Sequence, residues 1–179
     1  MTKKLFIEGT SDDSNGNLRI GFGLLLSKKL SGRMPDIVLG GGKHNCIGKF
    51  RAFTRTSNNA YLLIDLDNPI DQKGNEILAL NLSSSENELF FMVQEMEAWF
   101  LSQPDVLSRY YKVDLSGKIK GSVLDIEKPC KKMIDIIKKY TSKKTYHKVS
   151  DGAKLLAELN LDKLIRDFDD VQKLIDKLL

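Results

Sequence analysis

Acidic residues gather in three short clusters of the sequence, each directly after a run of apolar residues. The clusters are Glu8 with Asp12, Asp65 with Asp67, and Glu95 with Glu97. Magnesium prefers oxygen ligands, and it needs only a few carboxylates besides water and a substrate phosphate. A single acidic residue after a strand is more often a helix cap or part of a solvated turn. Three clusters in register with strand ends instead favour a shared site for a divalent cation.

The apolar runs in front of the acids predict buried parallel strands. Residues 4–9, 61–67 and 89–94 are short apolar segments that end in carboxylates or turn residues, which is typical of strands. In open α/β sheets the carboxyl ends of the strands form the edge where ligands bind. In extended chain Asp65 and Asp67 would leave the same face, about 6.6 Å apart at roughly 3.3 Å per residue. One hydrated ion could bridge them.

Strands and helices alternate through residue 101, and helices follow. This order predicts an α/β fold with a mainly parallel central sheet of about four strands, flanked by helices, and a C-terminal helical extension. The expected helices are 18–30, 46–56, 97–111 with a break at Pro104, 129–140, 151–159 and 161–179. The stretch 70–82 holds either a short helix over 76–80 or an irregular connection. We expect Trp99, Phe100, Tyr110 and Tyr111 to belong to the core.

A chain of 179 residues with 41% hydrophobic content can bury one real core, whereas two independent domains would be crowded. We therefore expect one compact domain, in which residues 1–116 form the α/β core and residues 117–179 form a basic helical extension packed on it.

Composition excludes several classes of protein. The sequence has no run of eighteen apolar residues and no signal-peptide core after Met1, so we expect a cytoplasmic protein with no membrane partner. Cys46 and Cys130 lack metal-type spacing and are expected to be free thiols. With only His44 and His147, neither a zinc site nor a Ser/His/Asp arrangement can be assembled.

Lysine is concentrated between Lys118 and Lys148, where ten lysines face only three acidic residues. A positive face beside a carboxylate centre suits a polyanionic substrate, but an ordinary solvated amphipathic helix explains the same lysines equally well. The glycines at 40–42 either let a backbone approach a phosphate or form a flexible turn. The candidate nucleic-acid-binding residues are Lys43, Lys49, Arg51, Arg55, Lys138, Lys139, Lys143, Lys144 and Lys148.

Several of these segments resemble known families. Glu8-Gly9-Thr10-Ser11-Asp12 and Asp65-Leu66-Asp67 resemble the Toprim domain of topoisomerases, bacterial primases and overcoming-lysogenization-defect nucleases. The segments 94–101 and 146–156 more closely resemble an uncharacterised bacterial Toprim-like family, domain of unknown function family 4276, and this resemblance covers nearly the whole chain. The Toprim resemblance implies a glutamate that acts as acid, base or metal ligand and an aspartate pair that holds magnesium. The second implies an ABC-type ATPase partner, an arrangement similar to antiphage nuclease systems.

Topoisomerase activity needs a tyrosine nucleophile on a separate domain, and primase activity needs template-binding modules, so hydrolysis fits this small chain better. We predict a magnesium-dependent nuclease, with manganese as the alternative ion, that acts on DNA or RNA. The candidate catalytic residues are Glu8, Asp12, Asp65, Asp67, Glu95 and Glu97, and the candidate metal ligands are Glu8, Asp65, Asp67 and Glu97. The competing hypothesis is a non-catalytic nucleic-acid-binding or regulatory subunit of an ATPase. Homo-oligomerisation stays open.

Overall fold

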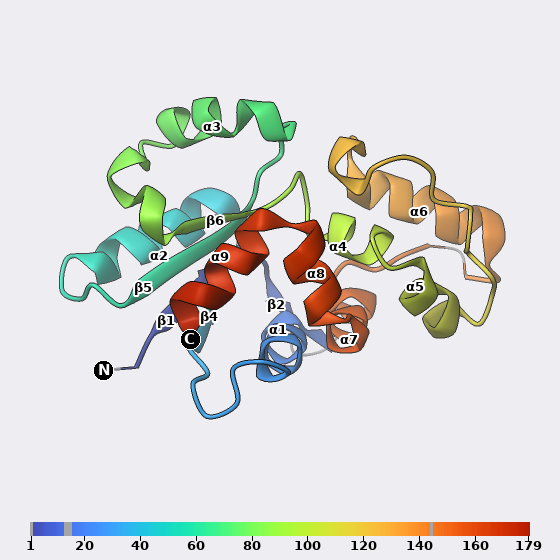
Figure 1. Ribbon diagram of the computed structural model, residues 1–179, viewed down its shortest axis with the longest axis horizontal. Helices are drawn as coiled ribbons and strands as arrows, with labels where there is room; N and C mark the ends of the chain where they lie inside the picture. The colour runs from blue at the N-terminus through green and yellow to red at the C-terminus, as the bar shows by residue number, and fades with distance from the viewer. Residues whose placement is uncertain (1, 13–15, 144) are drawn as a thin grey trace.

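A four-stranded parallel sheet forms the centre of the computed structural model, which describes residues 2–12, 16–143 and 145–179 (Figure 1). Its strands are β1 (Lys4–Ile7), β4 (Asp36–Leu39), β5 (Ala60–Asp65) and β6 (Leu89–Met92), in the order β4-β1-β5-β6. All three neighbouring pairs are parallel. A short antiparallel pair, β2 (Ser11–Asp12) with β3 (Gly16–Asn17), follows β1. The predicted α/β class and the parallel sheet of about four strands are confirmed.

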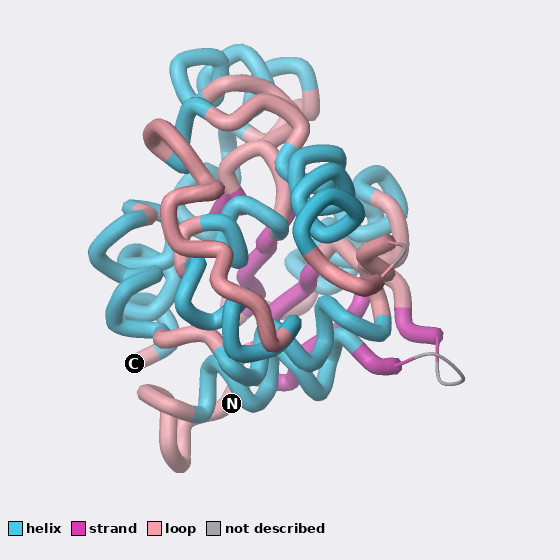
Figure 2. The backbone as a smooth tube through the Cα atoms, turned by 90° about the vertical axis from the view of Figure 1, so that its right-hand side faces the viewer, coloured by secondary structure: helices cyan, strands magenta, loops and turns pink. Residues whose placement is uncertain are grey.

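Helices cover both faces of the sheet, as the tube view in Figure 2 shows. The α-helices of the described residues are α1 (Leu18–Ser27), α2 (Lys43–Thr54), α3 (Lys73–Ala79), α4 (Glu97–Leu101), α5 (Pro104–Tyr111), α6 (Pro129–Tyr140), α7 (Ser150–Glu158), α8 (Leu161–Asp167) and α9 (Asp169–Leu178). The described residues also form the short 3₁₀ helices η1 (Ile70–Gln72), η2 (Ser83–Glu88) and η3 (Val123–Asp125). Among these residues no helix has the length and apolar character needed to cross a bilayer.

Successive strand residues face two separate apolar clusters, because side chains alternate across a sheet. Phe6 packs with Ile47 and Phe50 of α2 on one face. Leu5 and Ile7 pack on the other face, in a larger cluster that also contains side chains of α1, α4 and α6 to α9. Residues before and after position 117 share this larger cluster. The strands are apolar throughout because both of their faces are covered.

Helices α1 and α7 pack closely at Gly21. A Cβ atom added at Gly21 of α1 would lie 2.6 Å from the backbone oxygen of Ala153 in α7. Real Cβ atoms do not approach backbone this closely, so α1 and α7 can lie in contact only with glycine here. The contact holds the start of α7 against α1.

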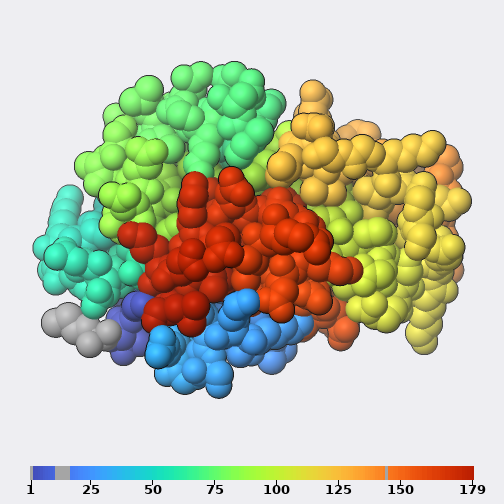
Figure 3. All heavy atoms as spheres, viewed as in Figure 1, coloured from blue at the N-terminus to red at the C-terminus, as the bar shows by residue number. Residues whose placement is uncertain are grey.

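The C-terminal helix α9 covers the outer edge of β6. Figure 3 shows the atoms of α8 and α9, in red, across the middle of one face of the molecule. Asp170 of α9 is 5% exposed, and its Oδ2 accepts a hydrogen bond of 2.8 Å from the backbone N–H of Phe91 in β6. The same carboxylate pairs with the ammonium of Lys73 at 2.6 Å.

Several helix boundaries differ from the sequence-based expectations. Residues 161–179 form two helices rather than one, because Phe168 has extended backbone angles (φ −136°, ψ 107°) and turns its buried ring into the core. Residues 70–82 hold η1 and α3, so the expected short helix begins earlier, at Lys73. The break at Pro104 is confirmed, with proline in the first turn of α5. Trp99 and Phe100 are buried as expected.

Candidate functional site

The carboxylates that follow three adjacent strands lie together at one edge of the sheet. Glu8 follows β1, Asp65 ends β5, and Glu97 opens α4 shortly after β6. The Oε2 atom of Glu8 accepts a hydrogen bond of 3.0 Å from the backbone N–H of Asp65. Asp65 in turn accepts through Oδ1 from the backbone N–H of Met96 at 3.0 Å. These bonds join the ends of three strands that are neighbours in space but distant in sequence.

The ammonium of Lys148 lies between the two most buried carboxylates of this group. Its Nζ atom is 3.4 Å from Asp65 Oδ2 and 3.6 Å from Glu97 Oε2. Glu97 is 0% exposed and Asp65 is 6% exposed, whereas the side chain of Lys148 is 42% exposed. Tyr146 donates its hydroxyl proton to Glu97 Oε1 at 2.9 Å. Among the described residues, Glu97 Oε2 has no hydrogen-bond partner besides this ion pair.

The pKa values of these groups are displaced in the direction expected for crowded, buried carboxylates. Burial raises the pKa of Asp65 to about 7, against the opposing effect of the Lys148 ammonium. Burial also raises the pKa of Glu8 and of Glu97. Burial alone would lower the pKa of Lys148, but the carboxylates of Asp65 and Glu97 outweigh it and raise the pKa. Displaced pKa values of this kind often accompany functional sites.

Two residues with left-handed backbone conformation stand at this edge. Asp67 has φ 63° and Gln94 has φ 56°. This backbone conformation costs a non-glycine residue on the order of 1–3 kcal/mol, and residues that adopt it are often found at functional sites. The backbone N–H of Asp67 donates to the carbonyl of Gln94 at 2.9 Å. Because β5 ends at Asp65 and the chain turns, the expectation that Asp65 and Asp67 leave one face of an extended strand is wrong.

Asp67 instead belongs to an ion-pair group at the rim of the site. Its carboxylate pairs with the ammonium of Lys43, which also contacts Glu76 Oε1 at 3.0 Å. Glu76 was not among the residues expected at the site, because it lies in the stretch 70–82, whose structure the sequence pattern leaves open. Lys43 is therefore held by two carboxylates.

A cavity of about 230 Å³ opens beside Glu8, Asp65 and Lys148. Gly41 and Gly42 also line it, and Gly42 is the N-cap of α2. The first backbone N–H groups of a helix have no intrahelical partner, and they favour an anion. The cavity thus combines carboxylates, a lysine and a helix N-terminus.

In chemical type the donors suit a hard divalent ion, because all are carboxylate oxygens and Glu97 Oε2 is buried without a hydrogen bond among the described residues. In the structure, however, the ammonium of Lys148 lies between the carboxylates of Asp65 and Glu97, which are spaced to contact it. Within residues 2–12, 16–143 and 145–179, no three His, Cys, Asp or Glu side chains are close enough together to hold a metal ion. Binding of a metal would require these side chains to move.

Other predicted acidic residues have different surroundings. Glu95 accepts a hydrogen bond of 2.6 Å from the backbone N–H of Cys130, so it caps the first turn of α6. The backbone of Asp12 belongs to β2, and its side chain is outside the described part of the structure.

The predicted basic residues divide into separate groups. Lys49 donates to the carbonyl of Leu39 at 3.3 Å, Arg51 donates to the carbonyl of Leu80 at 2.7 Å, and Arg55 is exposed at the end of α2. Lys138 and Lys139 are exposed in the last turn of α6, away from its start beside Glu95. Lys144 lies outside the described residues.

Lys143 and Lys139 contact tyrosine rings and lie apart from the acidic centre formed by Glu8, Asp65 and Glu97. Lys143 pairs with the buried Asp151 at 3.3 Å, and its ammonium lies 5.7 Å from the ring centroid of Tyr110. The ammonium of Lys139 lies 5.1 Å from the ring centroid of Tyr140. Of the eight predicted basic residues that the structure describes, only Lys148 pairs with the buried carboxylates Asp65 and Glu97. Lys43 reaches the rim.

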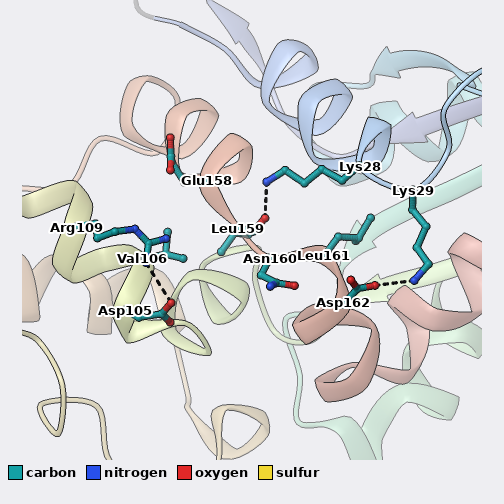
Figure 4. Close-up of a pocket in the computed structure, with 10 residues that line it drawn as sticks. All are labelled: Lys28, Lys29, Asp105, Val106, Arg109, Glu158, Leu159, Asn160, Leu161 and Asp162. Atoms are coloured by element: carbon teal, nitrogen blue, oxygen red, sulfur yellow. Dashed lines mark hydrogen bonds and ion pairs between the residues drawn. The ribbon is translucent and has the colours of Figure 1, made fainter.

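A larger hollow of about 480 Å³ lies elsewhere, at the junction of α1, α5, α7 and α8 (Figure 4). Its charged groups pair with one another: Lys29 contacts Asp162 at 2.6 Å, and Arg109 contacts Asp105 at 3.3 Å. Lys28 donates to the carbonyl of Leu159 at 2.6 Å. Because no strand end meets here and no buried carboxylate lines this hollow, the smaller cavity beside Asp65 is the better candidate for chemistry.

Comparison with known proteins gives one match. Residues 42–179 match the family described as Domain of unknown function (DUF4276). Asp65, Glu97 and Lys148 lie within the matched range, and Glu8 lies before it. No curated protein and no solved structure matches the chain.

Proposed function

Because the chain belongs to the family described as Domain of unknown function (DUF4276), which assigns no activity, we propose its function from the site: a divalent-metal-dependent nuclease that hydrolyses phosphodiesters. One observation carries the proposal. Buried carboxylates from the ends of β5 and β6 share a single ammonium, and a third carboxylate, Glu8, is hydrogen-bonded to the end of β5. A group of this kind needs positive charge, and a cavity opens beside it.

Asp65 and Glu97 would hold Mg²⁺ or Mn²⁺, with Glu8 as a further ligand or base and Asp67 at the rim. When bound, such an ion polarises a phosphate oxygen and lowers the pKa of a bound water. Tyr146 fixes the orientation of Glu97 by binding Oε1, which leaves Oε2 directed at the centre. Second contacts of this type orient ligands before they bind.

Glu8 is suited to accept the proton of an attacking water. It lines the cavity, and burial raises its pKa above the ordinary value for a glutamate, which makes its carboxylate a stronger base. Its Oε2 is fixed by the backbone N–H of Asp65. The other carboxylate oxygen is then available to a water in the cavity.

The glycine segment that lines the cavity is suited to a phosphate. Gly41 and Gly42 bring backbone to the cavity without side chains, and α2 begins directly after them. Backbone N–H groups and the helix dipole at this point favour an anion. Lys148 also lines the cavity and supplies positive charge.

A basic and aromatic surface at the end of α6, joined by Lys118 from the segment after α5, supports a nucleic-acid substrate. Lys118 and Lys139 both lie close to the ring of Tyr140, at 5.3 and 5.1 Å from its centroid. Two cations beside one ring attract phosphate, and aromatic rings accept stacked bases. At 1.5 Å per helical residue, Lys139 is about 14 Å along the α6 axis from Cys130, whose backbone N–H donates to Glu95. A few nucleotides of backbone cover this distance.

We also propose the finer kinship with Toprim domains. Its support is the order of the acids along the chain, with Glu8 after the first strand and Asp65 and Asp67 after β5. If the chain is related to Toprim domains, we expect the nuclease to act with an ABC-type ATPase partner and to take part in defence against phage.

A second candidate function is a non-catalytic subunit of an ATPase, and one surface feature favours it. Ile20 and Leu24 are one helical turn apart on α1 and are 61% and 51% exposed. Adjacent exposed apolar side chains are suited to contact with another protein.

The test is a cleavage assay with purified protein on plasmid, single-stranded DNA and RNA, in Mg²⁺, in Mn²⁺ and in EDTA. We expect cleavage that requires the metal and is lost in Asp65→Asn and Glu97→Gln. Asp162→Asn is the matched control, because it removes an exposed carboxylate in the hollow of Figure 4. Metal-independent cleavage, or cleavage that survives both site substitutions, would reject the proposal. Nucleic-acid binding without cleavage would favour the second candidate.

A further inference from the structure

We propose that Lys148 is a displaceable counter-ion, which neutralises Asp65 and Glu97 in the metal-free protein and must leave them before a divalent ion can bind. This inference rests on the proposed function, because it concerns how the same carboxylates exchange one cation for another. It assigns to Lys148 a role in controlling metal affinity.

The assignment of each carboxylate oxygen carries the argument. Asp65 Oδ1 is already used by the backbone N–H of Met96, and Glu97 Oε1 is used by the hydroxyl of Tyr146. The remaining oxygens, Asp65 Oδ2 and Glu97 Oε2, are the two that Lys148 contacts. A metal ion that binds both carboxylates through these oxygens therefore needs the position that the ammonium occupies.

The energetics favour exchange over simultaneous binding. Two buried carboxylates without a cation would be costly, and one ammonium leaves them only partly neutralised. The contacts of 3.4 and 3.6 Å are long for charge-assisted hydrogen bonds, which usually measure about 2.7–2.9 Å. A divalent ion at the same place would supply twice the charge at shorter oxygen distances.

Lys148 has a route out of the centre. Its side chain is 42% exposed and lines the cavity of about 230 Å³. The backbone before it is anchored, because the N–H of His147 donates to Asp151 Oδ2 at 3.0 Å. Rotation about the flexible side-chain bonds can thus move the ammonium toward the cavity while the backbone stays in place.

The test is direct measurement of Mn²⁺ binding by calorimetry and by electron paramagnetic resonance, without substrate. The variants are Lys148→Met, which removes the charge, and Lys148→Arg, which keeps it. Lys154→Met is the matched control, because Lys154 is an exposed lysine of the adjacent helix α7 and its loss changes the net charge equally. Thermal unfolding with and without Mn²⁺ reports on folding in every sample.

We expect Lys148→Met to bind Mn²⁺ about tenfold more tightly than wild type if Lys148 occupies the carboxylates nine-tenths of the time. Lys148→Arg should bind no more tightly than wild type, and Lys154→Met should match it. If Lys148→Met is less stable without metal, Mn²⁺ should raise its unfolding temperature more than that of wild type. Equal affinities in wild type and Lys148→Met would overturn the displacement role and leave the nuclease proposal intact. No Mn²⁺ binding in any variant would overturn both.

Discussion

Glu8 and Asp65 are joined by a hydrogen bond of 3.0 Å from the backbone N–H of Asp65 to the carboxylate of Glu8. The acceptor side chain follows one strand, and the donor is the last residue of the neighbouring strand. Because β1 and β5 are parallel and in register, this contact fixes a side chain to the frame of the sheet. Glu8 thus keeps its position relative to Asp65 without help from a loop.

The first prediction concerns this contact. Glu8→Gln should lower metal-dependent cleavage by about 100-fold or more, because it removes the proposed base but keeps the shape and the hydrogen bond. Its thermal unfolding should be nearly unchanged or improved, since one of several crowded carboxylates is neutralised. Cleavage rates and unfolding temperatures measured on the same preparations, with Asp162→Asn beside them, check both parts. A rate within threefold of wild type, on the order of 0.7 kcal/mol, would remove Glu8 from the proposed chemistry.

The second prediction concerns pH. The folded protein holds the Asp65 proton with a pKa of about 7, whereas the ordinary value is 3.8. As pH rises from about 4 to about 7, the unfolded chain releases this proton first, so the unfolding free energy should fall across that window. The contribution is on the order of 4 kcal/mol at most.

Urea unfolding at several pH values measures this fall, and Asp65→Asn provides the comparison. The variant should lose stability less steeply between pH 4 and 7, although Glu8 and Glu97 still contribute in the same direction because burial also raises their pKa values. Parallel stability curves for wild type and Asp65→Asn would show that Asp65 does not hold a proton in this range.

The third prediction concerns the glycine before the cavity. A Cβ at Gly40 would lie 2.3 Å from Cβ of Cys46 in α2, so Gly40→Ala should destabilise the fold by about 1–3 kcal/mol through overpacking. Gly48→Ala in the same helix is the matched control. No atom lies within 4 Å of its added Cβ, and alanine should stabilise the helix by about 0.5–1 kcal/mol. Chemical denaturation that gives the two substitutions the same sign would contradict this packing.

The fourth prediction concerns the lysines at the end of α6 and directly after it. Replacing Lys138, Lys139 and Lys143 by Glu should weaken binding to all nucleic-acid sequences alike and reduce the salt slope by about one for each lost phosphate contact. Lys173→Glu on α9 is the control for a change of charge at an exposed lysine elsewhere. Fluorescence anisotropy over a range of salt concentrations gives both quantities. Unchanged affinity and slope would mean that these lysines form only a solvated surface.

The fold class and the place of Glu8 and Asp65 could be predicted from sequence, and the reason is local. Apolar runs without alternation indicate strands covered on both faces, and in a parallel sheet the residues after such runs meet at one edge. The start of α5 at Pro104 follows equally from local chemistry, because proline suits the first turn of a helix.

The rest of the site depends on contacts that local pattern does not encode. Lys148 lies 83 residues beyond Asp65 and reaches it through the packing of α7 on α1. The turn at Asp67 replaces an extended conformation, so counting residues along a strand gave the wrong geometry. Glu95 caps α6 because its partner Cys130 arrives from 35 residues away. Each of these outcomes is decided by tertiary packing.

The carboxylate of Asp170 has a consequence for assembly. β6 is the outer strand of the sheet, and outer strands offer unpaired backbone groups to which a strand of another molecule can add. At Phe91 that group is already bound by Asp170, and Lys73 holds the carboxylate in place. An incoming strand would have to displace a buried, ion-paired side chain before its own backbone could pair. At Phe91 this border of the sheet is therefore closed to an added strand, so an apolar strand can stand at the margin of the sheet with less risk of growth into intermolecular β-structure.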